Sequence, residues 1–185
     1  MAVALEQARL AGERGEVPVG AVVVVVAEEA SAQHQQPLGT AAGNQAERQG
    51  DPTAHAEMLA LRSALASVSA RGDSWRAVMP RATLYVTCEP CPMCAGAALA
   101  CRVGRVVYGA RQPRVGADGS WASLLRRGRD GSDGGGGSAA TTEEDQQEHP
   151  YHPNLEVRSG VLADESAALL KAFFRRRRNG STQAG

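Results

Sequence analysis

Residues 83–101 read TLYVTCEPCPMCAGAALAC, and this stretch indicates a strand that leads directly into a helix. Thr83–Thr87 is rich in β-branched and aromatic side chains, which favours a strand. Pro92–Cys101 consists mostly of small residues, and we interpret it as a helix. Alternation of strand and helix is the pattern of an α/β fold.

The alternation extends in both directions from this stretch. Upstream we expect a helix at Ala2–Arg14, a buried strand at Gly20–Val26, a loop or ragged hairpin arm at Glu28–Thr40, and a helix at His55–Ala70 with Asp51 and Thr53 as capping candidates. Downstream we expect a strand at Arg105–Tyr108, a short helix at Trp121–Arg127, a strand at Leu155–Val157 and a helix at Ala163–Arg178. The pattern predicts a three-layer α/β/α sandwich with a central mixed sheet of about five strands.

Length and composition favour a single folded domain over residues 1–185, since 185 residues suffice for one complete core. Residues 128–149 are rich in glycine and acidic residues, so we expect a disordered low-complexity insertion there. The formal net charge is zero, so any binding of a polyanion must come from a local patch. No run of about 18 apolar residues exists, so we expect no membrane span, and no targeting signal is visible.

Two segments carry residues suited to metal chemistry, TAHAE at Thr53–Glu57 and EPCPMC at Glu89–Cys94. Cys91 and Cys94 are three residues apart near a helix start, so both sulfurs can face one point. The positive end of that helix favours the thiolate form, which metal binding requires. His55 begins the other helix and can supply a neutral nitrogen. Three protein ligands leave one position open for water, which is typical of catalytic zinc sites.

Glu57 lies two residues after His55, and this offset points its carboxylate away from the direction of the histidine. We therefore expect it to be a poor ligand in the same shell. It can still reach a water beside the metal and carry protons to and from it.

Cys88 extends the pattern to an even C-x-x-C-x-x-C spacing, which leaves a structural zinc knot or an iron–sulfur cluster as alternatives. A cluster would use Cys88, Cys91, Cys94 and Cys101. Ferredoxin spacing requires a cysteine where Ala97 stands, and the cluster hypothesis gives TAHAE no role. We interpret Cys88 and Cys101 as small buried hydrophobic residues.

The combination of H-A-E with a later P-C-x-x-C is the signature of zinc nucleobase deaminases. The stretches GEVPVGAVVV, DPTAHAEMLALR, LYVTCEPCPMCAGA, RVGRVVYGAR and GVLADESAALLKAFFRRRR make the chain resemble bacterial-type tRNA adenosine deaminases, which convert wobble adenosine to inosine. The resemblance implies one zinc ion per subunit, held by His55, Cys91 and Cys94. It also implies that Glu57 is the proton shuttle.

Further roles follow from the same resemblance. It implies that Asn44 hydrogen-bonds the flipped base and that Val19 and Ala56 belong to the pocket wall. The implied partners are a tRNA anticodon stem-loop, which we expect to come from an arginine tRNA, and a second copy of the chain in a homodimer. Arginines near the C-terminus are candidate RNA backbone contacts, although they can equally complement a helix dipole: Arg175, Arg176, Arg177 and Arg178. We interpret the preceding Phe173 and Phe174 as core residues.

Two other function classes share these motifs. One is a deaminase of a free base or nucleotide, of the guanine or cytosine type, which would carry the same HAE and PCxxC residues. The other is a zinc-stabilised RNA-binding module without activity. We expect an intracellular protein, in a plastid if the source is eukaryotic and algal, and otherwise in the bacterial cytoplasm.

Overall fold

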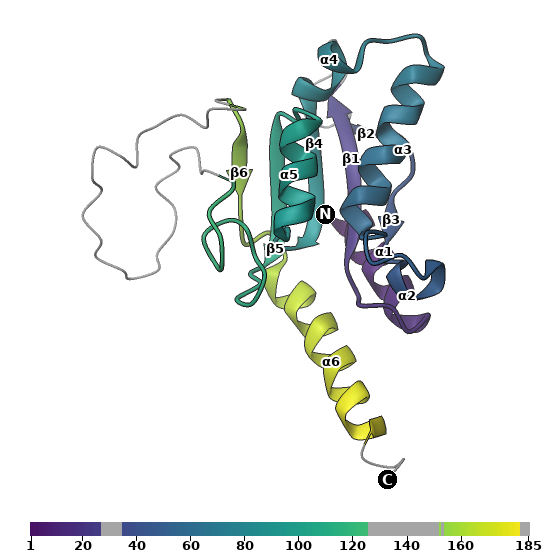
Figure 1. The fold of residues 1–185 in the computed structure, drawn as a ribbon, viewed down its shortest axis with the longest axis vertical. Coiled ribbons are helices and arrows are strands. Elements are labelled where there is room, and N and C mark those ends of the chain that lie inside the picture. The colour runs from purple at the N-terminus through teal and green to yellow at the C-terminus, as the bar shows by residue number, and fades with distance from the viewer. Residues whose placement is uncertain (27–34, 126–151, 153, 182–185) are drawn as a thin grey trace, which may run out of the picture.

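The computed structural model describes residues 1–26, 35–125, 152 and 154–181. The predictions for residues 28–34 and for the insertion at 128–149 lie outside the described residues. Within them, strands form one mixed sheet (Figure 1), composed of β1 Gly20–Val26, β2 Gln35–Pro37, β3 Ala42–Gly43, β4 Ala82–Cys88, β5 Arg105–Ala110 and β6 Glu156–Arg158.

The sheet has five strand positions, in the order β2–β1–β4–β5–β6. Strands β2 and β3 both pair with β1, at its two ends, and therefore share one edge position. Strand β1 is antiparallel to its neighbours, whereas β4 with β5 and β5 with β6 are parallel pairs. The mixed sheet of about five strands is thereby confirmed.

Helices cover both faces of the sheet, as predicted: α1 and α6 contact one face, and α3 and α5 lie together on the other (Figure 1). The helices are α1 Ala2–Glu13, α2 Ala46–Gln49, α3 Ala56–Ala70, α4 Trp75–Val78, α5 Pro92–Ala100 and α6 Ala163–Ser181, with a 3₁₀ turn η1 at Met79–Arg81. The C-terminal part of α6 extends beyond the ends of the strands. None of the helices in the described residues is long and apolar enough to cross a membrane.

The main core lies between the sheet and helices α3 and α5, and it includes Leu61, Leu84 and Tyr108. A smaller cluster on the other face joins Val22 and Val24 to α1. Valines alternate between the two clusters along β1, so this strand is buried on both faces, as its β-branched run predicts.

Two local expectations are wrong. Trp121–Leu125 is not helical, because its backbone N–H groups bond to the carbonyls of Gly116 and Ala117 and fold the segment back on itself. The cap of α3 is His55, and no side chain caps this helix. The carboxylate of Asp51 instead accepts hydrogen bonds from the N–H and hydroxyl of Thr53, which makes a separate turn before the helix.

Candidate metal centre and active site

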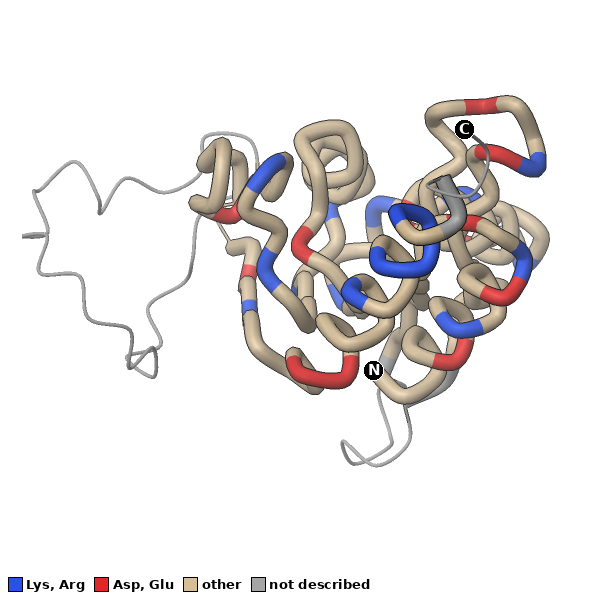
Figure 2. The backbone as a smooth tube through the Cα atoms, turned by 90° about the horizontal axis from the view of Figure 1, so that it is seen from below, with Lys and Arg blue, Asp and Glu red and all other residues tan. Residues whose placement is uncertain are grey.

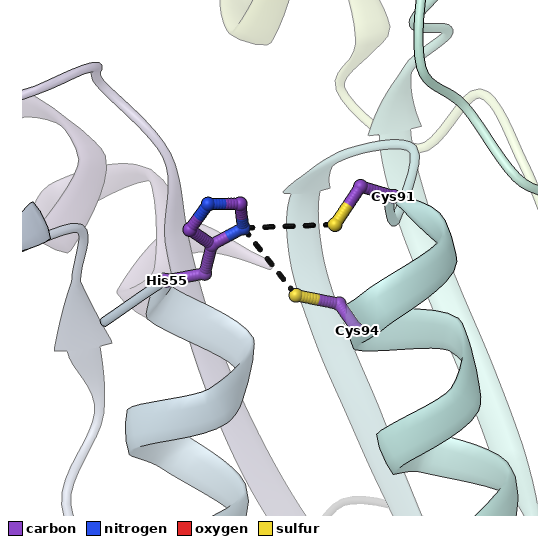
Figure 3. Close-up of side chains that lie close together, drawn as sticks. All are labelled: His55, Cys91 and Cys94. Carbon is purple, nitrogen blue, oxygen red and sulfur yellow. Dashed lines mark hydrogen bonds between the residues drawn. The ribbon is translucent and has the colours of Figure 1, made fainter. Parts of the chain in front are cut away.

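Two neighbouring helices begin at one place and bring three metal-binding side chains together (Figure 3). His55 is the N-cap of α3, Cys91 is the N-cap of α5, and Cys94 follows in the first turn of α5. His55 Nδ1 lies 3.6 Å from the Cys91 sulfur and 3.5 Å from the Cys94 sulfur. All three ligand atoms lie within 4.8 Å of one another.

These distances fit a tetrahedral zinc site. With Zn–S of about 2.3 Å, Zn–N of about 2.0 Å and an angle of about 109°, the nitrogen and each sulfur should be about 3.5 Å apart. One imidazole and two thiols are also a donor set that zinc prefers. The three side chains are therefore already arranged as zinc ligands would be. Among the described residues they form the group that can hold a metal ion.

Hydrogen bonds within this group favour the thiolate form of Cys91. The pKa of Cys91 is lowered to about 4, mainly because its sulfur accepts a hydrogen bond from the Cys94 thiol. For the same reason the pKa of Cys94 is raised. The hydrogen bond between His55 and Cys91 raises the pKa of His55. A metal ion therefore competes with protons at Cys94 and His55, so its binding should release protons.

A small pocket of about 160 Å³ is lined in part by His55 and Cys91. Its lining includes the predicted residues Val19, Asn44 and Glu57. Glu57 is only 4% exposed, and burial raises the pKa of its carboxyl group. The structure thus brings a buried carboxyl group and a buried amide to one cavity, which His55 and Cys91 also line. Ala56, also predicted for the pocket wall, is fully buried in the main core at the first position of α3.

The other two cysteines stand apart from the metal-binding group. Cys88 ends β4, is buried, and lines the pocket. Burial raises the pKa of its thiol to about 12, so it stays protonated at neutral pH. Cys101 follows α5 and is only partly buried against the main core, so it is less enclosed than expected.

Glu89 is a buried carboxylate whose role the sequence analysis missed. It accepts hydrogen bonds from the backbone N–H groups of Gln112 and Asp118, each at 2.9 Å, and from the hydroxyl of Ser120. These bonds hold the loop that contributes Gln112 and Val115 to the pocket. The available signal was an acidic residue in the otherwise apolar run between two cysteines.

A basic groove of about 410 Å³ lies beside this pocket, between the segment after β5 and one face of α6. Gln112 lines both cavities. The cationic residues of the groove are Arg111, Arg114, Lys171 and Arg178. Figure 2, which views α6 nearly end-on, shows basic positions on its C-terminal turns.

Of the four arginines predicted as RNA contacts, Arg178 lines this groove. Arg175 and Arg176 are exposed on α6, and the guanidinium of Arg177 lies 5.6 Å from the ring centroid of Phe173. Phe173 is buried as expected, but Phe174 is 40% exposed and lines the groove. The run of four neighbouring arginines therefore did not identify the cationic residues that line the basic groove, of which only Arg178 belongs to the run.

Comparison with known proteins gives consistent matches. The sequence model of the cytidine and deoxycytidylate deaminase zinc-binding region matches residues 1–110. The tRNA-specific adenosine deaminase of Bacillus subtilis (strain 168) is 38% identical over 175 residues, which cover 95% of this chain and 86% of the relative.

Two further comparisons involve a plant protein and a solved structure. The chloroplastic tRNA(adenine(34)) deaminase of Arabidopsis thaliana is 41% identical over 178 residues, or 96% of this chain, which spans 12% of the plant protein's length. A structure from a study of A-to-I editing by tRNA:A34 deaminases has a TM-score of 0.64 and 34% identity, and the match covers 92% of this chain and 97% of that one.

Proposed function

The chain belongs to the zinc-binding cytidine and deoxycytidylate deaminases, and within them to the tRNA-specific adenosine deaminases, and from this we propose that it converts adenosine to inosine at the wobble position of a tRNA anticodon. The observation that carries the proposal is the convergence of His55, Cys91 and Cys94 beside a pocket that contains Glu57. The relatives described above support an RNA substrate over a free base.

Each residue of the site has a definite task in this reaction. His55, Cys91 and Cys94 would hold zinc, which lowers the pKa of water to about 7 and so supplies a nucleophile at neutral pH. The carboxylate of Glu57 would accept a proton from the attacking water and return protons to N1 and to the amino group on C6 of adenine. That amino group leaves as ammonia, so adenosine and water give inosine and ammonia.

The pocket residues would receive the adenosine base outside its stack. A base buried between other bases cannot reach a recessed site, so deaminases extrude it, at low cost when it lies in a loop. Val17, Val19 and Val115 offer apolar wall to the faces of the base, and Asn44 offers an amide to one edge. Burial raises the pKa of the Glu57 carboxyl group, which favours a group that both takes and gives a proton.

The basic groove supports RNA as the substrate class. Because the formal net charge of the chain is zero, attraction to phosphates must come from a local surface. The groove gathers Arg111, Arg114, Lys171 and Arg178, and it shares Gln112 with the pocket. We propose that it holds phosphates next to the extruded adenosine, with the exposed ring of Phe174 available for stacking on a base.

An assay with defined substrates tests the proposed function. We expect the zinc-loaded protein to form inosine in an anticodon stem-loop with adenosine at the wobble position. The same stem-loop with adenosine only at another loop position should not react. Activity on free guanine or cytosine without activity on RNA would assign the chain to the free-base class. Tight RNA binding without any product would indicate a binding module. Stem-loops from an arginine tRNA and from other tRNAs would identify the preferred substrate.

Lys171→Ala is expected to weaken binding of the stem-loop about tenfold at low salt, since a hydrogen bond to a charged group contributes about 1.5 kcal/mol. The slope of log Kd against log salt should fall by about one, as expected for the loss of one phosphate contact. Fluorescence anisotropy at several salt concentrations measures both. Arg71→Ala, at the exposed C-terminal end of α3, is the matched control and should change neither quantity. Equal effects of the two substitutions would contradict a specific role for the groove.

We also propose that residues 1–185 form a single domain with an insertion at about 128–149, and that the chain works as a homodimer. The relatives match 95–96% of the chain, which supports the single domain. Light scattering of the purified chain distinguishes a dimer from a monomer.

An intracellular site of action, in a plastid if the source is an alga, is supported by the chloroplastic relative in Arabidopsis.

A further inference from the structure

A third buried carboxylate, Glu16, lies behind the pocket and contacts one of its residues. Glu16 follows α1 and is only 1% exposed. One of its oxygens, Oε2, accepts a hydrogen bond from the side-chain nitrogen of Asn44 at 3.2 Å. The same oxygen accepts one from the backbone N–H of Glu47, and Oε1 accepts one from the N–H of Arg48 at 2.8 Å. Glu16 thus joins the end of α1 to Asn44 and to the first turn of α2.

The contact determines which way the amide of Asn44 faces. An ionised carboxylate only accepts hydrogen bonds, so the amide must turn its NH₂ group toward Glu16. The backbone of Asn44 is also fixed, because its N–H donates to the carbonyl of Val19 at 2.9 Å. One amide N–H is thereby committed to Glu16. The carbonyl oxygen and the second N–H of Asn44 remain for a ligand in the pocket.

We infer that Glu16 is a positioning residue, which fixes the amide of Asn44 in the orientation that reads the edge of the substrate base. The inference rests on the proposed function, because it assigns the ligand of Asn44 to an adenine. Adenine presents an amino donor beside ring-nitrogen acceptors. A reversed amide would place its NH₂ group against the amino group of adenine and its carbonyl oxygen against a ring nitrogen. Neither pair can form a hydrogen bond, and leaving such groups unpaired in a pocket is costly. Glu16 excludes that reversed orientation, because its oxygens accept hydrogen bonds.

Glu16 also accepts two backbone N–H groups of α2, so part of its effect on the protein is structural. The two roles can be separated, since the positioning role acts only through the side chain of Asn44. Glu16→Gln keeps the size of the side chain, but its NH₂ group can donate to Asn44 and allow the reversed amide. Glu13→Gln is the matched control, because Glu13 is an exposed carboxylate three residues earlier.

A double-mutant cycle on the anticodon stem-loop tests the inference. We expect Glu16→Gln to lower kcat/KM about tenfold or more, through an unpaired or mismatched amide. Asn44→Ala should lower it at least as much. The double variant should then match Asn44→Ala alone, because Glu16 acts through Asn44. Glu13→Gln should leave kcat/KM unchanged. Effects of Glu16→Gln and Asn44→Ala that multiply, or no effect of Glu16→Gln, would overturn the inference.

An NMR measurement tests the contact without any activity and without altering Glu16. The side-chain amide signal of Asn44 is assigned by its loss in Asn44→Ala. In the wild-type protein we expect one of its protons to exchange slowly with water, whereas the exposed Asn154 and Asn179 exchange fast. Fast exchange of both Asn44 protons would overturn the inference even if the enzyme deaminates RNA. Slow exchange in a protein inactive on RNA would refute the proposed function and retain the contact.

Discussion

Replacing Glu57 with glutamine is expected to lower kcat for the wobble adenosine by about a hundred- to ten-thousand-fold, which is the usual contribution of a general acid and base. Glutamine has the same size and shape but cannot take up or release a proton at neutral pH. Glu57 is buried in the pocket beside the ligands and is outside the group that can hold the metal. Zinc content and the melting temperature should therefore stay close to their wild-type values.

The measurement combines single-turnover rates with zinc analysis and a Kd for the stem-loop. Glu165→Gln, an exposed carboxylate in the first turn of α6, is the matched control and should keep the wild-type rate. Loss of zinc in Glu57→Gln would show that Glu57 supports the metal site instead of moving protons. A wild-type rate in Glu57→Gln would remove Glu57 from the chemistry.

Local patterns account for the parts of the fold that the sequence could predict. The β-branched run of β1 and the apolar spacing of α3 depend on neighbours along the chain. Strand β1 has its predicted bounds, and α3 begins one residue later than predicted. Each half of the metal-binding group is also a local feature, because His55 and the pair Cys91 and Cys94 each lie at the start of a helix. That the two helix starts meet is a tertiary contact, which the combination of H-A-E with P-C-x-x-C indicated.

Long-range hydrogen bonds explain what the sequence could not predict. Glu16 bonds residues 28 to 32 positions away, and Glu89 bonds residues 23 to 31 positions away, so no local pattern identifies the partners of either carboxylate. The segment after Trp121 has a helix-like composition, but its N–H groups find the carbonyls of Gly116 and Ala117. The hydrogen bonds of the two carboxylates are tertiary, whereas those of this segment reach back five to eight positions, and in both cases they override or supplement local preference.

Replacing Cys91 and replacing Cys88 should have opposite effects on zinc content and turnover, although the two cysteines lie only three residues apart. Cys91→Ala is expected to reduce zinc from about one ion per chain to near zero and to abolish turnover, since two protein ligands do not retain a catalytic zinc. Cys91 is also the thiolate of the group, with its pKa lowered to about 4, so its loss removes the charge that attracts the cation. Zinc analysis after dialysis, together with the stem-loop assay, measures both effects.

Cys88→Ala is the matched control, because Cys88 lies only three residues before Cys91 and lines the same pocket. Cys88 lies outside the group of side chains whose ligand atoms are all within 4.8 Å of one another, and burial raises the pKa of its thiol to about 12. The alanine variant should keep zinc and most activity, at a cost of about 1 kcal/mol in stability from the lost buried sulfur. Equal loss of metal in both variants would mean that the even C-x-x-C-x-x-C spacing holds the metal through all three cysteines. With His55 as the fourth ligand the site would be a closed structural one, and the open position that a hydrolytic deaminase needs would not exist.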